Sequence, residues 1–197
     1  MAIDSMTLIR VALIPLSILT FSLIMASLCG NTWLYNYTET TRFVDTETRI
    51  GLWFVCATLY DYGIPTTTCI ASDTDVKDFF QATRAFLIMA TMPALIAIIL
   101  CVVVNCSQKY RAFIVSIPFG LTALFLLIGL SSFTGRVNAN DDSDFDYSKY
   151  SYGWSHNIGW LAFPLTIGCA VLSIVCGISR MTGMTGMTGM SSMDHQS

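Results

Sequence analysis

Cys56 and Cys69 are the residues whose type and spacing most clearly permit chemistry, because both lie in one polar stretch between apolar runs. Two thiols in the same loop can pair as a disulfide in an oxidising compartment. A redox-active or metal-binding pair is the alternative, but the chain has no CxxC spacing and no histidine near these cysteines. We therefore predict a structural disulfide, which would stabilise the loop by about 3 kcal/mol.

Other groups that could react are few. The chain has 2 histidines, and its sequence contains no phosphate-binding loop and no recognisable nucleophile–base pair. Asp142, Asp144 and Asp146 imitate the start of a calcium loop, but Tyr147 stands where such a loop requires glycine. We prefer a solvated acidic rim to a calcium site, and we expect no enzymatic activity, no bound metal and no cofactor.

The composition indicates a membrane protein. Hydrophobic residues make up 54% of the chain and charged residues only 12%, whereas a soluble domain carries about 25% charged residues. Most of the surface must therefore be covered by lipid. The net charge of −3 provides no basic surface for nucleic acid, so we expect the lipid bilayer as a partner and no nucleic acid.

Four apolar runs are long enough to cross a bilayer, which requires about 20 helical residues. We predict an all-α transmembrane four-helix bundle over residues 1–180 and a disordered cytosolic tail over 181–197, where Met-Thr-Gly repeats show no periodic apolar face. The first run is long for a signal peptide and no basic residue precedes it closely, so we expect it to remain as a span. The predicted spans are residues 7–29, 85–104, 113–133 and 157–178, and the large loops between them are residues 30–81 and 134–156.

Basic residues indicate the orientation of these spans. Lys109 and Arg111 lie in a short connector without acidic residues, whereas carboxylates outnumber the basic residues of the two large loops. The positive-inside rule then places both termini in the cytosol and the large loops outside, with the protein in the plasma membrane. Asn36-Tyr37-Thr38 is a glycosylation sequon in the first outer loop, so we expect a glycan on Asn36. The sequon at Asn105 falls on the cytosolic side and should be silent.

The first outer loop is long enough to fold. Four of its segments are rich in β-branched and aromatic residues, which favour strands, and Tyr62-Gly63-Ile64-Pro65 is a turn signal. We predict a small extracellular antiparallel β-sheet pinned by the disulfide, because so small a sheet needs such a staple. The predicted strand segments are residues 32–37, 42–45, 49–60 and 66–70.

A helix should begin near Val76 and run unbroken into the second span, which places Arg84 at the outer lipid boundary. There Arg84 could anchor the helix, bond to carbonyl groups of the loop or face a partner. We prefer a structural role.

Together these features resemble the claudin signature, a pattern of W…GLW…C…C in the first extracellular loop of a four-span protein. The wider superfamily includes peripheral myelin and epithelial membrane proteins, a lens fibre membrane protein, and gamma subunits of ion channels. The resemblance implies a claudin-like fold, with the bundle carrying the extracellular sheet. The residues that carry it are Trp33, Gly51, Leu52, Trp53, Cys56, Cys69 and Arg84.

The resemblance implies three functional classes. The first is a protein of cell–cell contacts and junctions that associates with itself in cis and in trans to form or tune a paracellular barrier or pore. The second is an auxiliary gamma-type subunit that regulates an ion channel or receptor. The third is a myelin-type or epithelial-membrane-type protein. The final residues, 194–197, lack the apolar end that PDZ domains bind, so we expect no scaffold link of that kind.

Charge and thiols add two expectations. In the first outer loop three basic residues face seven acidic ones, so a path lined by this loop would concentrate cations. Cys106 and Cys176 lie near the cytosolic ends of spans and are candidates for palmitoylation, with unmodified packing cysteines as the alternative. The candidates for charge selectivity are Glu39, Asp45, Glu47 and Asp61.

Overall fold

The structure is a computed structural model that describes the backbone of residues 5–41, 44–71, 78–106, 112–139 and 146–190. Within these ranges, the side chains of residues 5–10, 39–41, 44, 112 and 179–190 lie outside the description. The elements in chain order are α1 (Ser5–Cys29), β1 (Leu34–Thr41), β2 (Val44–Ile50), β3 (Phe54–Asp61), β4 (Ile64–Ala71), α2 (Asp78–Cys106), the 3-10 turn η1 (Ala112–Val115), α3 (Ser116–Ala139), the 3-10 turn η2 (Tyr147–Lys149), β5 (Ser151–Tyr152) and α4 (Trp154–Met190).

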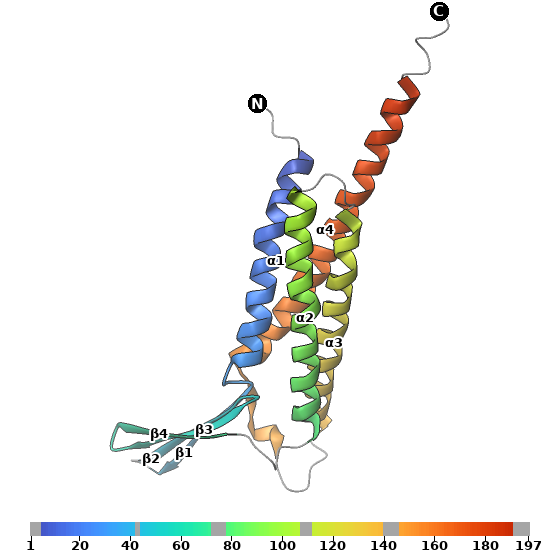
Figure 1. The fold of residues 1–197 in the computed structure, drawn as a ribbon. Helices are drawn as coiled ribbons and strands as arrows, with labels where there is room; N and C mark the ends of the chain where they lie inside the picture. Colours follow the sequence, from blue (N-terminus) through green and yellow to red (C-terminus); the bar gives the residue numbers. More distant parts are fainter. Residues whose placement is uncertain (1–4, 42–43, 72–77, 107–111, 140–145, 191–197) are drawn as a thin grey trace, which may run out of the picture.

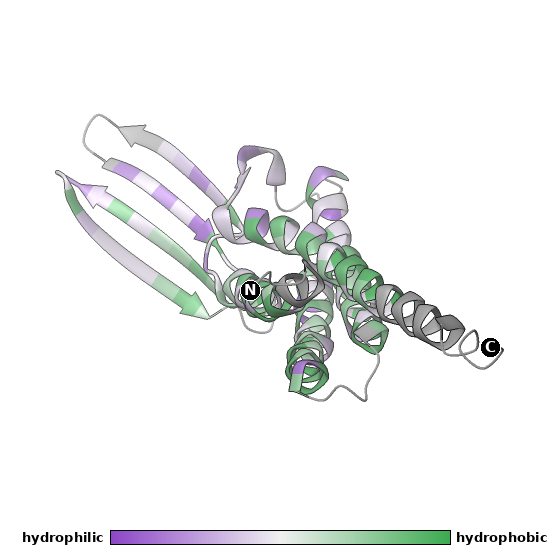
Figure 2. Cartoon of the chain, turned by 90° about the horizontal axis from the view of Figure 1, so that it is seen from above, coloured by the Kyte–Doolittle hydropathy of each residue, from purple (hydrophilic) through white to green (hydrophobic). Residues whose placement is uncertain are grey.

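The four helices form one bundle, and each helix contacts the next around a closed ring in which α4 returns to α1. The sheet projects sideways from one end of this bundle, and the beginning of α1 and the end of α4 lie at the opposite end (Figure 1). We call these the sheet end and the far end. Hydrophobic residues dominate the helices, whereas hydrophilic residues gather in the sheet and the neighbouring turns (Figure 2).

The predicted four spans are confirmed, because the described part of the chain contains 4 helices long and apolar enough to cross a membrane. Their ends differ from the prediction at the sheet end. There α3 continues to Ala139 and α4 begins at Trp154, beyond the predicted limits of residues 133 and 157. These extra turns contain polar residues, which an apolar-run criterion excludes but a helix tolerates once nucleated. The predicted unbroken helix through Arg84 into the second span is confirmed from Asp78 onward; residues 72–77 lie outside the described residues.

The tail also differs from the prediction. The structure continues α4 through the Met-Thr-Gly repeats to Met190, where we expected disorder from residue 181. Adding residues to an existing helix avoids the cost of nucleation, so low complexity alone does not exclude helix there. Residues 191–197 lie outside the described residues.

The sheet is antiparallel with strand order β4-β3-β2-β1-β5. The turn between β3 and β4 has positive φ at Tyr62 (48°) and Gly63 (80°), which suits a tight hairpin that follows the twist of its strands. Pro65 lies in β4, an edge strand, where its missing N–H is tolerated. The short strand β5 was not predicted. It comes from the second large loop and pairs with Leu34 and Tyr35 at the start of β1.

The prediction of one strand over residues 49–60 was wrong. The structure breaks this segment at Gly51-Leu52-Trp53, which forms the turn between β2 and β3 and is closed by a 2.9 Å bond from the N–H of Gly51 to the carbonyl of Phe54. Propensity favours strand at Trp53. Tertiary contacts of the turn override it, as described below.

Two apolar clusters fill the bundle. The smaller one lies toward the far end and includes Leu13, Val115 and Phe119. The larger one lies at the sheet end and joins helix residues such as Leu130 to Leu34 of β1. Because this second cluster includes strand residues, the start of the sheet belongs to the same core as the helices.

Candidate functional site

The sheet is attached to α1 by two tryptophans. Since α1 ends at Cys29, the carbonyls of its last turn have no partner within the helix. The indole N–H of Trp33 donates to the carbonyl of Ser27 at 2.9 Å, and the indole N–H of Trp53 donates to the carbonyl of Leu28 at 2.9 Å. An indole satisfies a carbonyl while presenting an apolar body, which suits a helix end near a bilayer surface.

Arg84 joins α2 to the same attachment. Its Nε donates to the carbonyl of Leu52 at 2.6 Å, and its guanidinium lies over the ring of Trp53, 5.1 Å from the centroid. The residue is only 8% exposed. Of the three roles considered from the sequence, the geometry shows the bond to a loop carbonyl. Arg84 therefore fixes the position of the turn between β2 and β3 relative to α2.

Glycine is required at the start of this turn. A Cβ at Gly51 would lie 2.7 Å from the Cα of Asn31, much closer than real Cβ contacts. The backbone of the turn can therefore approach the segment after α1 only if residue 51 has no side chain. This approach brings Trp53 within reach of the end of α1.

Trp33 is fully buried in an aromatic cluster that the sequence did not predict. Its ring centroid lies 4.8 Å from that of Phe133 on α3 and 5.7 Å from that of His156 on α4. The Nε2 of His156 accepts from the indole N–H of Trp160 at 3.1 Å, and the ring of Tyr152 stacks on the imidazole at 4.4 Å. Helix periodicity places Phe133, His156 and Trp160 on the inner faces of their helices, but it carries no information on which loop residue they contact.

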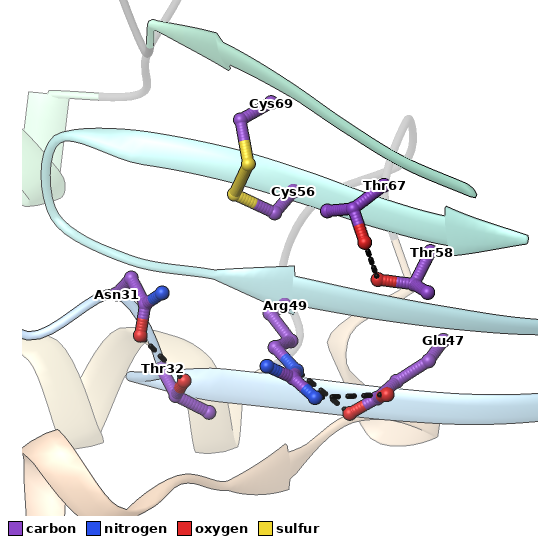
Figure 3. The surroundings of a disulfide bond; sticks show 8 residues. All are labelled: Asn31, Thr32, Glu47, Arg49, Cys56, Thr58, Thr67 and Cys69. Carbon is purple, nitrogen blue, oxygen red and sulfur yellow. Dashed lines mark hydrogen bonds and ion pairs between the residues drawn. A yellow bond between two sulfur atoms is a disulfide. The ribbon is translucent and has the colours of Figure 1, made fainter. Parts of the chain in front are cut away.

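The sheet has two chemically different faces, which follow from the register because directly opposite residues share a face. Cys56 lies opposite Cys69 in β3 and β4, with a Cα–Cα distance of 4.1 Å, and the two form a disulfide (Figure 3). The predicted disulfide is thus confirmed. We call its side the disulfide face, and its members include Tyr35, Tyr37, Asp45, Glu47, Arg49, Phe54, Cys56, Thr58, Tyr60, Thr67 and Cys69.

We call the opposite side the threonine face. Four of its residues form one row across the sheet, because Asn36 pairs with Thr48, Thr48 with Ala57, and Ala57 with Thr68. The other members of this face include Leu34, Thr46, Ile50, Val55, Leu59, Asp61, Ile64, Thr66 and Ile70. The threonine face therefore combines small hydroxyl residues with aliphatic ones.

The structure separates the acidic residues that the sequence grouped for charge selectivity. Asp45 and Glu47 lie on the disulfide face, and Glu39 pairs with Asp45 through the backbone, although the side chain of Glu39 lies outside the described residues. Asp61 instead lies on the threonine face, exposed at the end of β3. Any path along one face of the sheet would therefore not encounter all four carboxylates together.

The carboxylates of the disulfide face differ in their partners. Glu47 accepts from Nε and from one terminal nitrogen of Arg49 at 2.7 and 3.0 Å, and this paired hydrogen bond lowers the pKa of Glu47. Asp45 accepts from the hydroxyl of Tyr37 at 2.8 Å and has no cationic partner among the described side chains. Among the described side chains, Asp45 is thus the carboxylate of this pair whose charge has no compensating cation.

Other predicted positions lie apart from this attachment. Asn36 is half-buried in β1. Cys106 is exposed at the last residue of α2, whereas Cys176 is completely buried in α4, where a modifying enzyme could not reach its thiol. Asp146 caps η2 by accepting from the backbone N–H of Ser148 at 3.1 Å; residues 141–145, including the other aspartates of the calcium-like pattern, lie outside the described residues.

Comparison with known proteins is consistent with this geometry. The model of the PMP-22/EMP/MP20/Claudin family matches residues 6–173, which include the sheet and nearly all of the membrane-spanning part of the bundle. No curated protein matches the chain as a relative. Because the family match covers most of the sequence, the chain belongs to the PMP-22/EMP/MP20/Claudin family of four-span membrane proteins, which is not a family of enzymes.

Proposed function

We propose that this protein is a claudin-like component of cell–cell contacts in the plasma membrane, with both termini in the cytosol and the sheet outside the cell. It would associate with further copies of itself through the sheet and form or tune a paracellular barrier or pore. The support for this proposal is the combination of a firmly attached sheet with a surface suited to binding.

The observation that carries the proposal is a group of exposed aromatic residues on the disulfide face. Tyr35, Tyr37 and Phe54 are 41%, 50% and 52% exposed, although none of them lies in a membrane-spanning helix. Tyrosine and phenylalanine are enriched where proteins contact one another. Since the sheet projects sideways beyond the bundle (Figure 1), these residues are accessible to a neighbouring molecule.

The test is imaging of the tagged protein in mixed cultures of expressing and non-expressing cells. Enrichment only at borders between two expressing cells would support adhesion in trans. The variant Tyr35→Ser with Phe54→Ser should lose this enrichment. Ile64→Ser is the matched control, because Ile64 is 69% exposed but lies on the threonine face. Uniform staining together with co-purification of a channel would instead indicate an auxiliary channel subunit and overturn the proposal.

Charge selectivity can be tested by comparing two neighbouring carboxylates. Asp45→Asn removes a charge without a cationic partner among the described side chains and should lower the permeability of sodium relative to chloride across an epithelial monolayer. Glu47→Gln should lower it as well, because it leaves the charge of Arg49 uncompensated. Glu47→Gln with Arg49→Gln removes both charges of the pair and should leave selectivity close to wild type. Unchanged selectivity in Asp45→Asn would contradict a role in ion permeation.

Cys106 remains a candidate for palmitoylation, because it is exposed at the far end of α2. Replacing it by serine should abolish hydroxylamine-sensitive labelling of acylated cysteines in the full-length protein. Persistent labelling in Cys106→Ser would show that another cysteine carries the acyl group.

A further inference from the structure

The side chain of Asn36 begins a shallow row on the threonine face. The row continues through Thr48, Ala57 and Thr68 to the edge of β4, and no member beyond Asn36 is larger than threonine. With about 4.8 Å between strands, three steps make the row roughly 14 Å long. Thr48 is half-buried, and Ala57 and Thr68 are exposed, so the row is open to solvent.

The residues on either side of the row are well suited to a carbohydrate. Leu59 and Ile70 flank it and are 44% and 65% exposed. Sugar rings present C–H groups that can cover aliphatic side chains, and their hydroxyls can bond with threonine hydroxyls, which both donate and accept. A carbohydrate could thus cover the exposed aliphatic residues beside the row without a protein partner.

The backbone around Asn36 is also accessible. β5 pairs only with Leu34 and Tyr35, so β1 has no second neighbouring strand from Asn36 onward within the described residues. An unpaired strand edge can recruit another strand unless it is blocked. A bulky group on Asn36 would prevent such pairing on this side of the sheet.

We propose that Asn36 carries an N-linked glycan whose core lies along the row Thr48-Ala57-Thr68, so that the exposed part of the threonine face is covered by sugar and the disulfide face is left for protein contacts. In the modification, Nδ2 of Asn36 loses a proton and bonds to C1 of the first sugar of a lipid-linked oligosaccharide donor, while the lipid diphosphate leaves and takes up the proton. The assignment of contacts to the disulfide face rests on the proposed function; the position of the glycan does not.

The first test compares electrophoretic mobility of the full-length protein from cultured epithelial cells before and after treatment with a glycosidase that removes N-linked glycans. The wild type should shift on treatment. Asn36→Gln and Thr38→Ala should both migrate at the treated position, whereas Thr38→Ser should retain the shift. Asn105→Gln is the control, since its sequon lies at the far end of α2, and it should behave as wild type. Absence of a shift in the wild type, or its persistence in Asn36→Gln, would overturn the proposal.

The second test measures which face the glycan covers. Ala57→Cys and Tyr35→Cys place thiols on the threonine face and the disulfide face respectively, in a Cys29→Ser background because Cys29 is exposed. Labelling by a bulky, membrane-impermeant maleimide should be slow at position 57 and should accelerate after glycan removal or with Asn36→Gln, while position 35 should be unaffected. Equal acceleration at both positions, or none at position 57, would refute the placement. Neither readout depends on whether the protein acts at cell contacts.

Discussion

Replacement of Arg84 by methionine tests whether the attachment of the sheet depends on this residue. The substitution keeps an unbranched side chain but removes the 2.6 Å bond to the Leu52 carbonyl and the guanidinium over Trp53. A hydrogen bond from a charged donor contributes about 1.5–3 kcal/mol, and a partly desolvated cation–π contact about 1 kcal/mol. Part of this loss is offset, because the variant no longer buries a cation. We therefore expect the free energy of unfolding to fall by about 3 kcal/mol.

The measurement is the thermal unfolding midpoint of the purified protein in detergent, followed by tryptophan fluorescence. For a chain of this size, about 3 kcal/mol corresponds to a decrease of roughly 6–12 °C. Arg84→Lys retains the charge but not the planar group that both stacks and donates, and it should fall between the wild type and Arg84→Met. Arg136→Met is the matched control, because Arg136 is an exposed arginine in the last turn of α3, and it should leave the midpoint unchanged.

A double-mutant cycle with Trp53→Leu separates the two contributions. If the guanidinium stabilises the sheet partly through the indole, the two losses should be non-additive by about 1 kcal/mol. Strict additivity would assign the whole effect to the Leu52 carbonyl. An unfolding midpoint of Arg84→Met equal to that of the wild type would refute the argument that Arg84 secures the turn.

Three further predictions concern the sheet and its attachment. Replacing Cys56 and Cys69 by alanine should destabilise the hairpin by about 3 kcal/mol, measured as faster amide hydrogen exchange in β4. Unchanged exchange would contradict the stabilisation of the hairpin by the disulfide. Gly153→Ala should strongly reduce the yield of folded protein, because a Cβ there would overlap the backbone carbonyl of Thr32. Gly168→Ala is the control, because a Cβ at Gly168 meets open space, and it should be neutral or slightly stabilising. The bond to Arg49 lowers the pKa of Glu47 in the folded state, so it stabilises the sheet fully above the ordinary carboxyl pKa of 4.5. This contribution decreases as the pH falls from there through the lowered pKa of the folded state. The difference in unfolding free energy between wild type and Glu47→Gln should therefore narrow on acidification, and a constant difference would be inconsistent with this ionisation.

The bundle could be predicted from sequence because its determinants are local. Long apolar runs identify the four spans, and the paired cysteines and the strand-forming loop identify the stapled sheet. The ends of the helices could not be predicted in this way. Ala139 ends a turn of α3 that also contains Arg136 and Asn138, so a search for apolar runs stops before it. Phe80 and Val137 in the end turns of α2 and α3 nevertheless belong to the same apolar core.

The attachment of the sheet could be predicted only in part. The motif singled out Trp33, Trp53 and Arg84, but sequence spacing does not show that all three side chains donate to backbone carbonyls. The partners of Trp33, Phe133 and His156, come from distant helices, and nothing in the local pattern of either helix distinguishes them from other inward-facing residues. Likewise, the strand register that places Asp61 on the opposite face from Asp45 depends on the turn at Gly51, which strand propensity alone does not reveal.

The chemistry of the motif suggests why tryptophan rather than another aromatic residue occupies positions 33 and 53. Phenylalanine could fill much of the same space, but it has no donor for the carbonyls of Ser27 and Leu28. A helix that ends where lipid gives way to a folded sheet has less water to satisfy those carbonyls. Trp33→Phe should therefore lower the free energy of unfolding by more than its lost volume implies, because the buried carbonyl of Ser27 loses its donor. An unsatisfied buried group costs about 1–3 kcal/mol. Trp53→Phe should lower the free energy of unfolding by less, because its hydrogen bond to the carbonyl of Leu28 is only partly buried and Trp53 itself is 37% exposed. The reverse order of unfolding midpoints would show that packing, rather than the indole hydrogen bonds, maintains the joint between helix and sheet.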